Sequence, residues 1–211
     1  MGAIIYGVRG MDPNLPKRRK PRPKKPAPPP PEGRAVSLVS GAGFAVFGRP
    51  HRLRIDHDPT APPIALEPGP SGYLRLRADQ DEHTIIDWYR ALLTADLARS
   101  RMVRELMQRL QVEPRVVVAE LAPGTWCRYD GRSQTVTLHW ALAQYDRVIA
   151  YYGLVHALVH ATRPPGSKHG PHFRSKLQTA CVALHASPAA LDKQLRDGVS
   201  DVWLGRMTDT A

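Results

Sequence analysis

The sequence predicts an α+β domain with a small antiparallel sheet, a long helix, a β-hairpin and further helices, preceded by a disordered basic, Pro-rich tail. The chain has 211 residues, of which 42% are hydrophobic and 23% charged, enough for one core and a tail. Short β-type runs come first, and apolar residues with helical spacing follow them. We therefore divide the chain into a tail (residues 1–34), a domain (35–200) and a polar C-terminal end (201–211).

Residues 1–34 hold most of the positive charge. They contain nine basic and two acidic residues, a net charge of +7, whereas the whole chain carries +11. The segment from Lys17 to Pro26 mixes Lys and Arg with Pro, which lacks a backbone donor, so this stretch should stay extended and solvated. Two interpretations remain open: an arm that binds nucleic acid or another polyanion, and a solubilising terminus. No aromatic residue interrupts the basic cluster, so base stacking by the arm has no support.

Four short runs of β-forming residues follow, at residues 36–39, 44–47, 53–55 and 73–76, with glycine and proline turns between them. They predict antiparallel hairpins. A long helix should then begin at Asp79 or Asp81 and run to about Val112. Its apolar residues recur every three or four positions and should face the core: Ile85, Ile86, Tyr89, Leu92, Leu93, Leu97, Val103, Leu106, Met107 and Leu110.

The second half predicts a strand, a hairpin and three helices. Residues 115–121 are rich in valine, and Asp130-Gly131 is a hairpin signal that leads into an alternating strand over 135–140. Helices should span about 144–161, a segment that begins at Pro171, and about 188–198. In the helix that begins at Pro171, we expect Phe173, Leu177 and Val182 to share one apolar face.

Two histidines in the predicted helix over 144–161 point to a metal site. His156 and His160 are four residues apart, so their side chains share one helix face and can reach one ion. A catalytic zinc site normally has three protein ligands. By spacing alone His169 and His172 are both eligible as the third, with His185 a remoter choice. The alternative is a packed, hydrogen-bonded pair, but the His-Gly turn nine residues after His160 favours the metal site.

The order of these motifs resembles the zinc metallopeptidases of the YgjP-like and SprT-like families. Gly124-Thr125-Trp126-Cys127 stands where the YgjP-like group has Trp-Gly-Ser-Cys, and Thr137-Leu138-His139-Trp140 is similar to its Leu-Asn-Trp strand end. His169-Gly170-Pro171-His172-Phe173 is more similar to the corresponding motif of the SprT-like family. The resemblance covers about residues 36–195, and the part from Trp126 to Phe173 is specific. Further segments that fit are Phe47-Gly48-Arg49-Pro50, Leu53-Arg54-Ile55 and Asp87-Trp88-Tyr89-Arg90.

The resemblance implies a zincin-like metallopeptidase fold that binds Zn²⁺ through His156, His160 and His169 and hydrolyses peptide bonds of a peptide or protein substrate. His172 then becomes a neighbour of the site. Both families have Glu after the first ligand, as the general base that takes a proton from the attacking water. This chain has Ala157 there, and a methyl group accepts no proton. We therefore expect zinc binding with severely impaired hydrolysis, and we assign no catalytic or substrate-binding residue.

Other carboxylates offer little replacement for the missing base. No Asp or Glu occurs between Asp146 and Asp192, and nothing in the sequence directs Glu120 or Asp130 to the metal. Two explanations of Ala157 stay open, a natural pseudoenzyme and an engineered inactivation. A different reading of the chain is a non-catalytic zinc module that the basic arm delivers to nucleic acid or protein.

Location and minor roles follow from the remaining features. Cys127 and Cys181 are too few for a disulfide framework and are expected as free thiols. The sequence has no apolar run of about 18 residues and no secretory signal, so we expect a cytoplasmic protein with no membrane partner. We expect Trp140 to be buried in the sheet rather than to line a substrate groove, and Cys127 to have a structural role.

Overall fold

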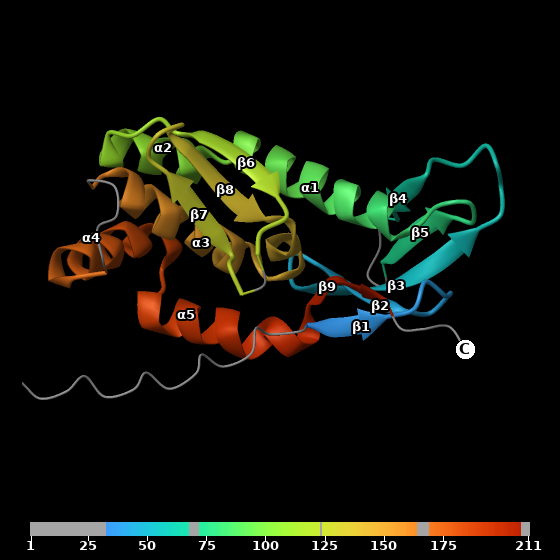
Figure 1. Cartoon of the computed structure of the whole chain (residues 1–211). Coiled ribbons are helices and arrows are strands. Elements are labelled where there is room, and N and C mark those ends of the chain that lie inside the picture. Colours follow the sequence, from blue (N-terminus) through green and yellow to red (C-terminus); the bar gives the residue numbers. More distant parts are fainter. Residues whose placement is uncertain (1–32, 68–71, 123, 164–168, 208–211) are drawn as a thin grey trace, which may run out of the picture.

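Two sheets joined by a long helix form the frame of the structure, a computed structural model that describes residues 33–67, 72–122, 124–163 and 169–207 (Figure 1). The predicted α+β class is confirmed. Residues 1–32, which make up nearly all of the predicted tail, lie outside the described residues. No helix in the described ranges is both long and apolar enough to span a membrane.

The first sheet has the strand order β2-β3-β5-β4. Its strands are β2 (Gly43–Val46), β3 (Arg49–Asp56), β4 (Ile64–Leu66) and β5 (Tyr73–Arg77). β2 and β4 pair antiparallel with their neighbours, but β3 and β5 are parallel, so the sheet is mixed and the purely antiparallel expectation was wrong. The difference arises because β4, which we did not predict, lies between β3 and β5 in the sequence.

The predicted long helix consists of two helices. α1 (Glu82–Arg99) begins after Asp81, whose carboxylate accepts hydrogen bonds from the N–H groups of His83 and Thr84. The chain leaves helical geometry at Ser100, which ends α1 and caps α2 (Arg101–Leu110) by accepting a hydrogen bond from the N–H of Val103. Serine stabilises such a cap, which explains a break that the continuous apolar spacing does not reveal.

The second sheet has the order β6-β8-β7, with β6 (Arg115–Ala119), β7 (Cys127–Asp130) and β8 (Thr135–His139). The predicted hairpin is confirmed, since β7 and β8 are antiparallel, and β6 pairs with β8 in parallel. α1 packs against both β4 and β6 and so connects the two sheets (Figure 1). The chain after β8 forms a short 3-10 helix, η1 (Trp140–Gln144).

The remaining helices are α3 (Arg147–Ala161), α4 (Pro171–Cys181) and α5 (Pro188–Asp197), with short 3-10 helices η2 (Val182–Leu184) and η3 (Gly198–Asp201). α3 starts later than predicted because residues 140–144 form η1. α4 begins at Pro171, as predicted. Val182 is 64% exposed, so its predicted place on an apolar face was wrong: α4 ends at Cys181, and the tighter η2 turns Val182 outward.

The predicted polar C-terminal end contains a strand that sequence analysis missed. β9 (Trp203–Met207) pairs in parallel with β1 (Arg34–Val36). Trp203 is fully buried, and the Gln144 side chain holds its backbone by donating to its carbonyl oxygen (2.7 Å) and accepting from its N–H (3.0 Å). The Trp203 ring packs against Phe44 of β2 and Trp140 of η1. Trp140 is buried, as expected, and β9 completes the core between the two sheets.

Candidate metal centre

α3, in which His156 and His160 share one side, is the most buried α-helix among the described residues. Nine of its 15 residues are buried, and the two histidines are only half-buried, so they lie where the helix emerges from the core. Their ring centroids are 5.3 Å apart, as expected for side chains one helical turn apart. The apolar residues around them fix the helix, and the helix fixes the separation of the two imidazoles.

His169 reaches the same point from the segment before α4. Gly170 caps α4 and Pro171 occupies its first turn, so the direction of the chain at His169 is set by the start of that helix. Arg174 in the first turn of α4 donates from Nε to the carbonyl oxygen of His169 (3.3 Å). His169 Nε2 lies 3.3 Å from Nε2 of His156 and 2.8 Å from Nε2 of His160.

These three histidines form one cluster, and the other eligible histidines do not join it. One ring nitrogen from each of His156, His160 and His169 lies within 4.8 Å of the others. His172 and His185 are exposed and belong to no such group among the described residues. Spacing left His169 and His172 equally eligible, and the geometry brings only His169 to the pair.

Phe173 supports the whole cluster, a role that we did not predict. Its ring centroid lies 5.2 Å from that of His156, 4.6 Å from that of His160 and 4.4 Å from that of His169. Phe173 is 2% exposed and sits in the first turn of α4. It therefore acts as an apolar floor that holds three rings together. The spacing from His169 was a usable signal, because residues four apart meet when a helix begins between them.

Burial keeps the α3 imidazoles neutral. Desolvation lowers the pKa of His156 to about 4, and the neighbouring His160 and His169 act in the same direction. Desolvation also lowers the pKa of His160, with smaller contributions from His169 and Arg163. A neutral imidazole has one nitrogen with a free lone pair, which is the form that binds metal.

The donor set fits a metal ion better than it fits an internal hydrogen-bond network. The Nε2 atoms of the three histidines converge on one point. If the ring N–H of one histidine donates a hydrogen bond to the Nε2 of a second, the Nε2 lone pair of the third still has no donor within the cluster. Two nitrogens that bind one zinc ion tetrahedrally lie about 3.3 Å apart, close to the separation of His156 and His169. His169 is exposed, whereas His156 and His160 are half-buried.

Comparison with known proteins agrees with this geometry. Residues 25–194 match the family model described as YgjP-like, metallopeptidase domain. The chain belongs to this family. Comparisons with curated proteins and with solved structures gave no match. Membership of the YgjP-like metallopeptidase family implies a metal ion, and the cluster of His156, His160 and His169 offers a place for it.

The metal cluster of this YgjP-like domain contains no carboxylate among the residues that the structure describes. Ala157, which follows His156, is buried. Glu120 lies 3.9 Å from a guanidinium nitrogen of Arg90, and Asp130 accepts hydrogen bonds from Arg132 and Ser133 in the hairpin turn. Neither is part of the cluster.

Asp192 is the acidic residue that acts on the cluster from a distance. It lies on α5 and accepts a hydrogen bond from the hydroxyl of Tyr152 (2.7 Å). Tyr152 is four residues before His156 and packs edge-on against its ring. The charge of Asp192 slightly opposes the lowering of the His156 pKa. Helical spacing could have identified Tyr152, but nothing local predicts that α5 folds back against α3.

Both thiols stand apart from the site. Cys127 and Cys181 are free, and neither belongs to the histidine cluster in the described part of the chain. Desolvation raises the pKa of Cys127 to about 12 and that of Cys181 to about 11. Since the thiolate is the form that binds metal, thiols with raised pKa values are poor ligands.

Proposed function

We propose that this chain is a zinc-binding YgjP-like domain in which peptide-bond hydrolysis is severely impaired, that is, a pseudoenzyme. The convergence of the three Nε2 atoms of His156, His160 and His169 supports the zinc site. Zinc suits this donor set because neutral imidazole is one of its preferred ligands. The absence of a carboxylate at position 157 supports the loss of activity.

On this proposal the chain keeps the residues that bind the metal and lacks the residue that acts as general base. His156, His160 and His169 hold the metal, while Phe173 keeps their rings in place. Bound zinc supplies an activated water and polarises the peptide carbonyl. A proton must then pass to a base, and the Ala157 side chain cannot take it. General base catalysis is worth about 10²–10⁴-fold, so hydrolysis should fall by that factor.

A peptide or protein remains the ligand that the site should accept. β7 is an edge strand of the second sheet and packs beside α3, so one side of it faces no other strand of that sheet. An extended peptide can pair with such an edge through its main chain, which places a peptide bond next to the metal helix. We propose this edge as the docking strand, without assigning specific side chains.

Restoring the base tests the proposal. We compare Ala157→Glu with Ala157→Gln, which has nearly the same size but cannot accept the proton, on an unstructured protein such as casein. Zinc content and melting temperature of both variants show whether the buried position tolerates the larger side chain. The proposal predicts cleavage by Ala157→Glu that a chelator abolishes, and none by Ala157→Gln. Zinc-dependent cleavage by the unaltered chain at the same rate as Ala157→Glu would contradict it.

A further inference from the structure

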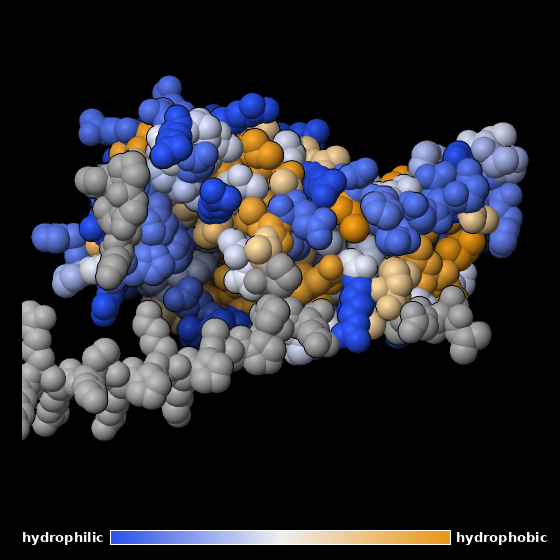
Figure 2. Space-filling model, viewed as in Figure 1, coloured by the Kyte–Doolittle hydropathy of each residue, from blue (hydrophilic) through white to orange (hydrophobic). Residues whose placement is uncertain are grey.

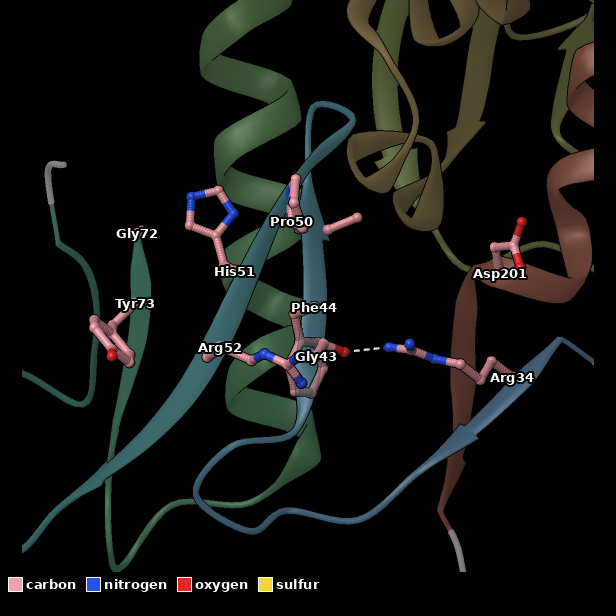
Figure 3. A pocket seen from close by; sticks show the side chains of 10 residues that line it. Arg34, Gly43, Phe44, Pro50, His51, Arg52, Gly72, Tyr73 and Asp201 are labelled. Carbon is pink, nitrogen blue, oxygen red and sulfur yellow. Dashed lines mark hydrogen bonds between the residues drawn. The ribbon is translucent and has the colours of Figure 1, made fainter. Parts of the chain in front are cut away.

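A hollow lies between the β1–β9 pair and the outer face of the first sheet, away from the metal centre. Its volume is about 510 Å³. In Figure 3 Arg34 and Asp201 form one wall, Arg52 and Tyr73 form the other, and the β2 segment around Gly43 forms the floor. We call this hollow, together with Arg54 beside it, the basic groove. It is far from α4, the helix next to the metal centre (Figure 1).

The arginines of the basic groove form no ion pair with a carboxylate among the residues that the structure describes. Arg34 donates to the carbonyl oxygen of Gly43, and Arg52 donates to that of Gly41 (3.0 Å). Both acceptors are neutral carbonyls. Arg54 is exposed, and within the described ranges no carboxylate forms an ion pair with any of the three. Asp201 is the one acidic residue among the described residues that line the hollow.

The rest of the same sheet face is neutralised, so the charge is concentrated at the groove. Arg75 lies 3.5 Å from Asp56 and 3.3 Å from Glu67, and Arg77 pairs with Asp79 at 2.7 Å. In Figure 2 this end of the molecule has a mixed surface, with hydrophilic residues beside a hydrophobic patch. Positive charge without a protein partner, held on a rigid sheet, is the usual feature of an anion-binding surface.

An aromatic ring lies among these charges. Tyr73 is 41% exposed, and in the parallel register of β3 and β5 it is the direct neighbour of Arg52. Paired residues of adjacent strands face the same side of the sheet, and in Figure 3 the Arg52 guanidinium extends toward the β2 segment around Gly43 and away from the Tyr73 ring. Gly72 keeps the hollow open next to the ring, because a Cβ there would lie 2.4 Å from Cδ2 of His51.

We propose that the basic groove binds single-stranded nucleic acid, with phosphates on Arg34, Arg52 and Arg54 and one base stacked on Tyr73. Arginine forks match phosphate oxygens, and aromatic rings on sheet faces stack unpaired bases. An acidic peptide would satisfy the arginines but has no flat partner for the ring. The bases of a duplex are already stacked and cannot reach it. This proposal goes beyond the metal site and does not depend on the histidines.

The position of the groove agrees with the charge of the N-terminal segment. Arg34 lies nine residues after Lys25, the last residue of the basic cluster that begins at Lys17. The groove supplies the aromatic ring that the cluster lacks.

The test measures binding of a labelled oligothymidine to the full chain by fluorescence anisotropy over a range of salt concentrations. Arg52→Gln and Arg54→Gln should each weaken binding and should each reduce the slope of log K against log [salt] by about 0.7. Tyr73→Ala should weaken binding about five- to a hundredfold with an unchanged slope, whereas Tyr73→Phe should bind normally. Melting temperatures verify that each variant is folded.

Arg109→Gln is the matched control, since Arg109 is an exposed arginine in the last turn of α2, away from the groove. If the groove variants lose no more affinity than Arg109→Gln, the N-terminal cluster alone explains binding and the proposal is wrong. If the arginine variants lose affinity but Tyr73→Ala does not, the site holds a polyanion without base stacking, which also overturns it. Competition by polyglutamate as strong as that by unlabelled oligothymidine would overturn it as well.

Discussion

The histidine cluster and the basic groove hold side chains of the same broad class, nitrogen bases, in opposite electrostatic states. Around α3 burial lowers the pKa of His156 to about 4, so the cluster presents lone pairs and suits a cation. On the outer face of the first sheet, Arg52 and Arg54 are exposed guanidinium groups, so the groove suits an anion. Residue type sets this difference, since guanidinium is always a cation, and burial strengthens it by keeping the α3 imidazoles neutral.

The largest effect should come from removing one imidazole of the cluster. His169→Ala should lower zinc affinity by more than about 100-fold, because the loss of even an outer-shell partner costs up to that factor. Equilibrium competition with a chromophoric chelator measures it. His172→Ala is the matched control, three residues away and outside the cluster, and should bind zinc normally. Equal losses in the two variants would mean that His169 is not a ligand.

Removing the floor of the cluster should have the next largest effect. Phe173→Ala should reduce the free energy of unfolding by about 3–5 kcal/mol, since the ring is buried and touches all three histidines. Urea unfolding with and without zinc measures both stability and metal binding. Val182→Ala is the control, because Val182 directly follows the last residue of α4 and is 64% exposed. It should change the free energy of unfolding by less than about 0.5 kcal/mol. A mild effect of Phe173→Ala would show that the ring does not hold the cluster.

A buried histidine outside the metal site gives a test of pH dependence. Desolvation, with a smaller contribution from Arg90, lowers the pKa of His139 to about 4, and its Nδ1 accepts a hydrogen bond from the N–H of Ala141 (3.1 Å). Between pH 6.5 and about 4 the unfolded state binds more protons at His139 than the folded state does. The stabilisation from neutral His139 is therefore fully present above pH 6.5 and is lost as the pH falls toward 4. The His139 contribution should be about 1.4 kcal/mol per pH unit.

His139→Asn isolates this contribution, because the asparagine side chain can accept the same hydrogen bond but does not titrate. Urea unfolding of the metal-free chain at several pH values should show a shallower dependence in the variant, by one proton. His156 and His160 still titrate in both proteins, so they cancel in the difference. Parallel curves for the two proteins would mean that His139 is not buried as a neutral ring.

The smallest effect should be that of the groove arginines on folding. Arg54→Gln should change the free energy of unfolding by less than about 0.5 kcal/mol, because Arg54 is exposed and forms no ion pair within the described residues. Urea unfolding measures it. A decrease in the free energy of unfolding of more than about 1 kcal/mol would show that Arg54 contributes to folding and is not free to bind a ligand.

Local patterns predicted the elements that carry the metal site, while long-range contacts remained hidden. The four-residue spacing of His156 and His160 identified two members of the cluster, and the family resemblance pointed to His169 as the third. Spacing could not choose between His169 and His172, because the choice depends on how α4 packs against α3. The parallel pairing of β3 with β5 and the packing of α5 against Tyr152 have no local signal.

The C-terminal strand shows the same limit in another way. Residues 203–207 include a glycine and an arginine and read as an irregular polar end, yet Trp203 fills the core between Phe44 and Trp140. The backbone of Trp203 is held by two hydrogen bonds with the side chain of Gln144, which is 59 residues away in the chain. Ser100 is a contrasting case, since its capping role is local and could have been read from the sequence.

The account depends most on three imidazoles sharing one zinc ion, and X-ray absorption at the zinc edge of the zinc-loaded full chain tests this directly. We predict three imidazole nitrogens at about 2.0–2.1 Å and no sulfur near 2.3 Å. A sulfur shell, which would have to come from Cys127 or Cys181, or fewer than three imidazoles around the ion, would contradict the assignment of His156, His160 and His169.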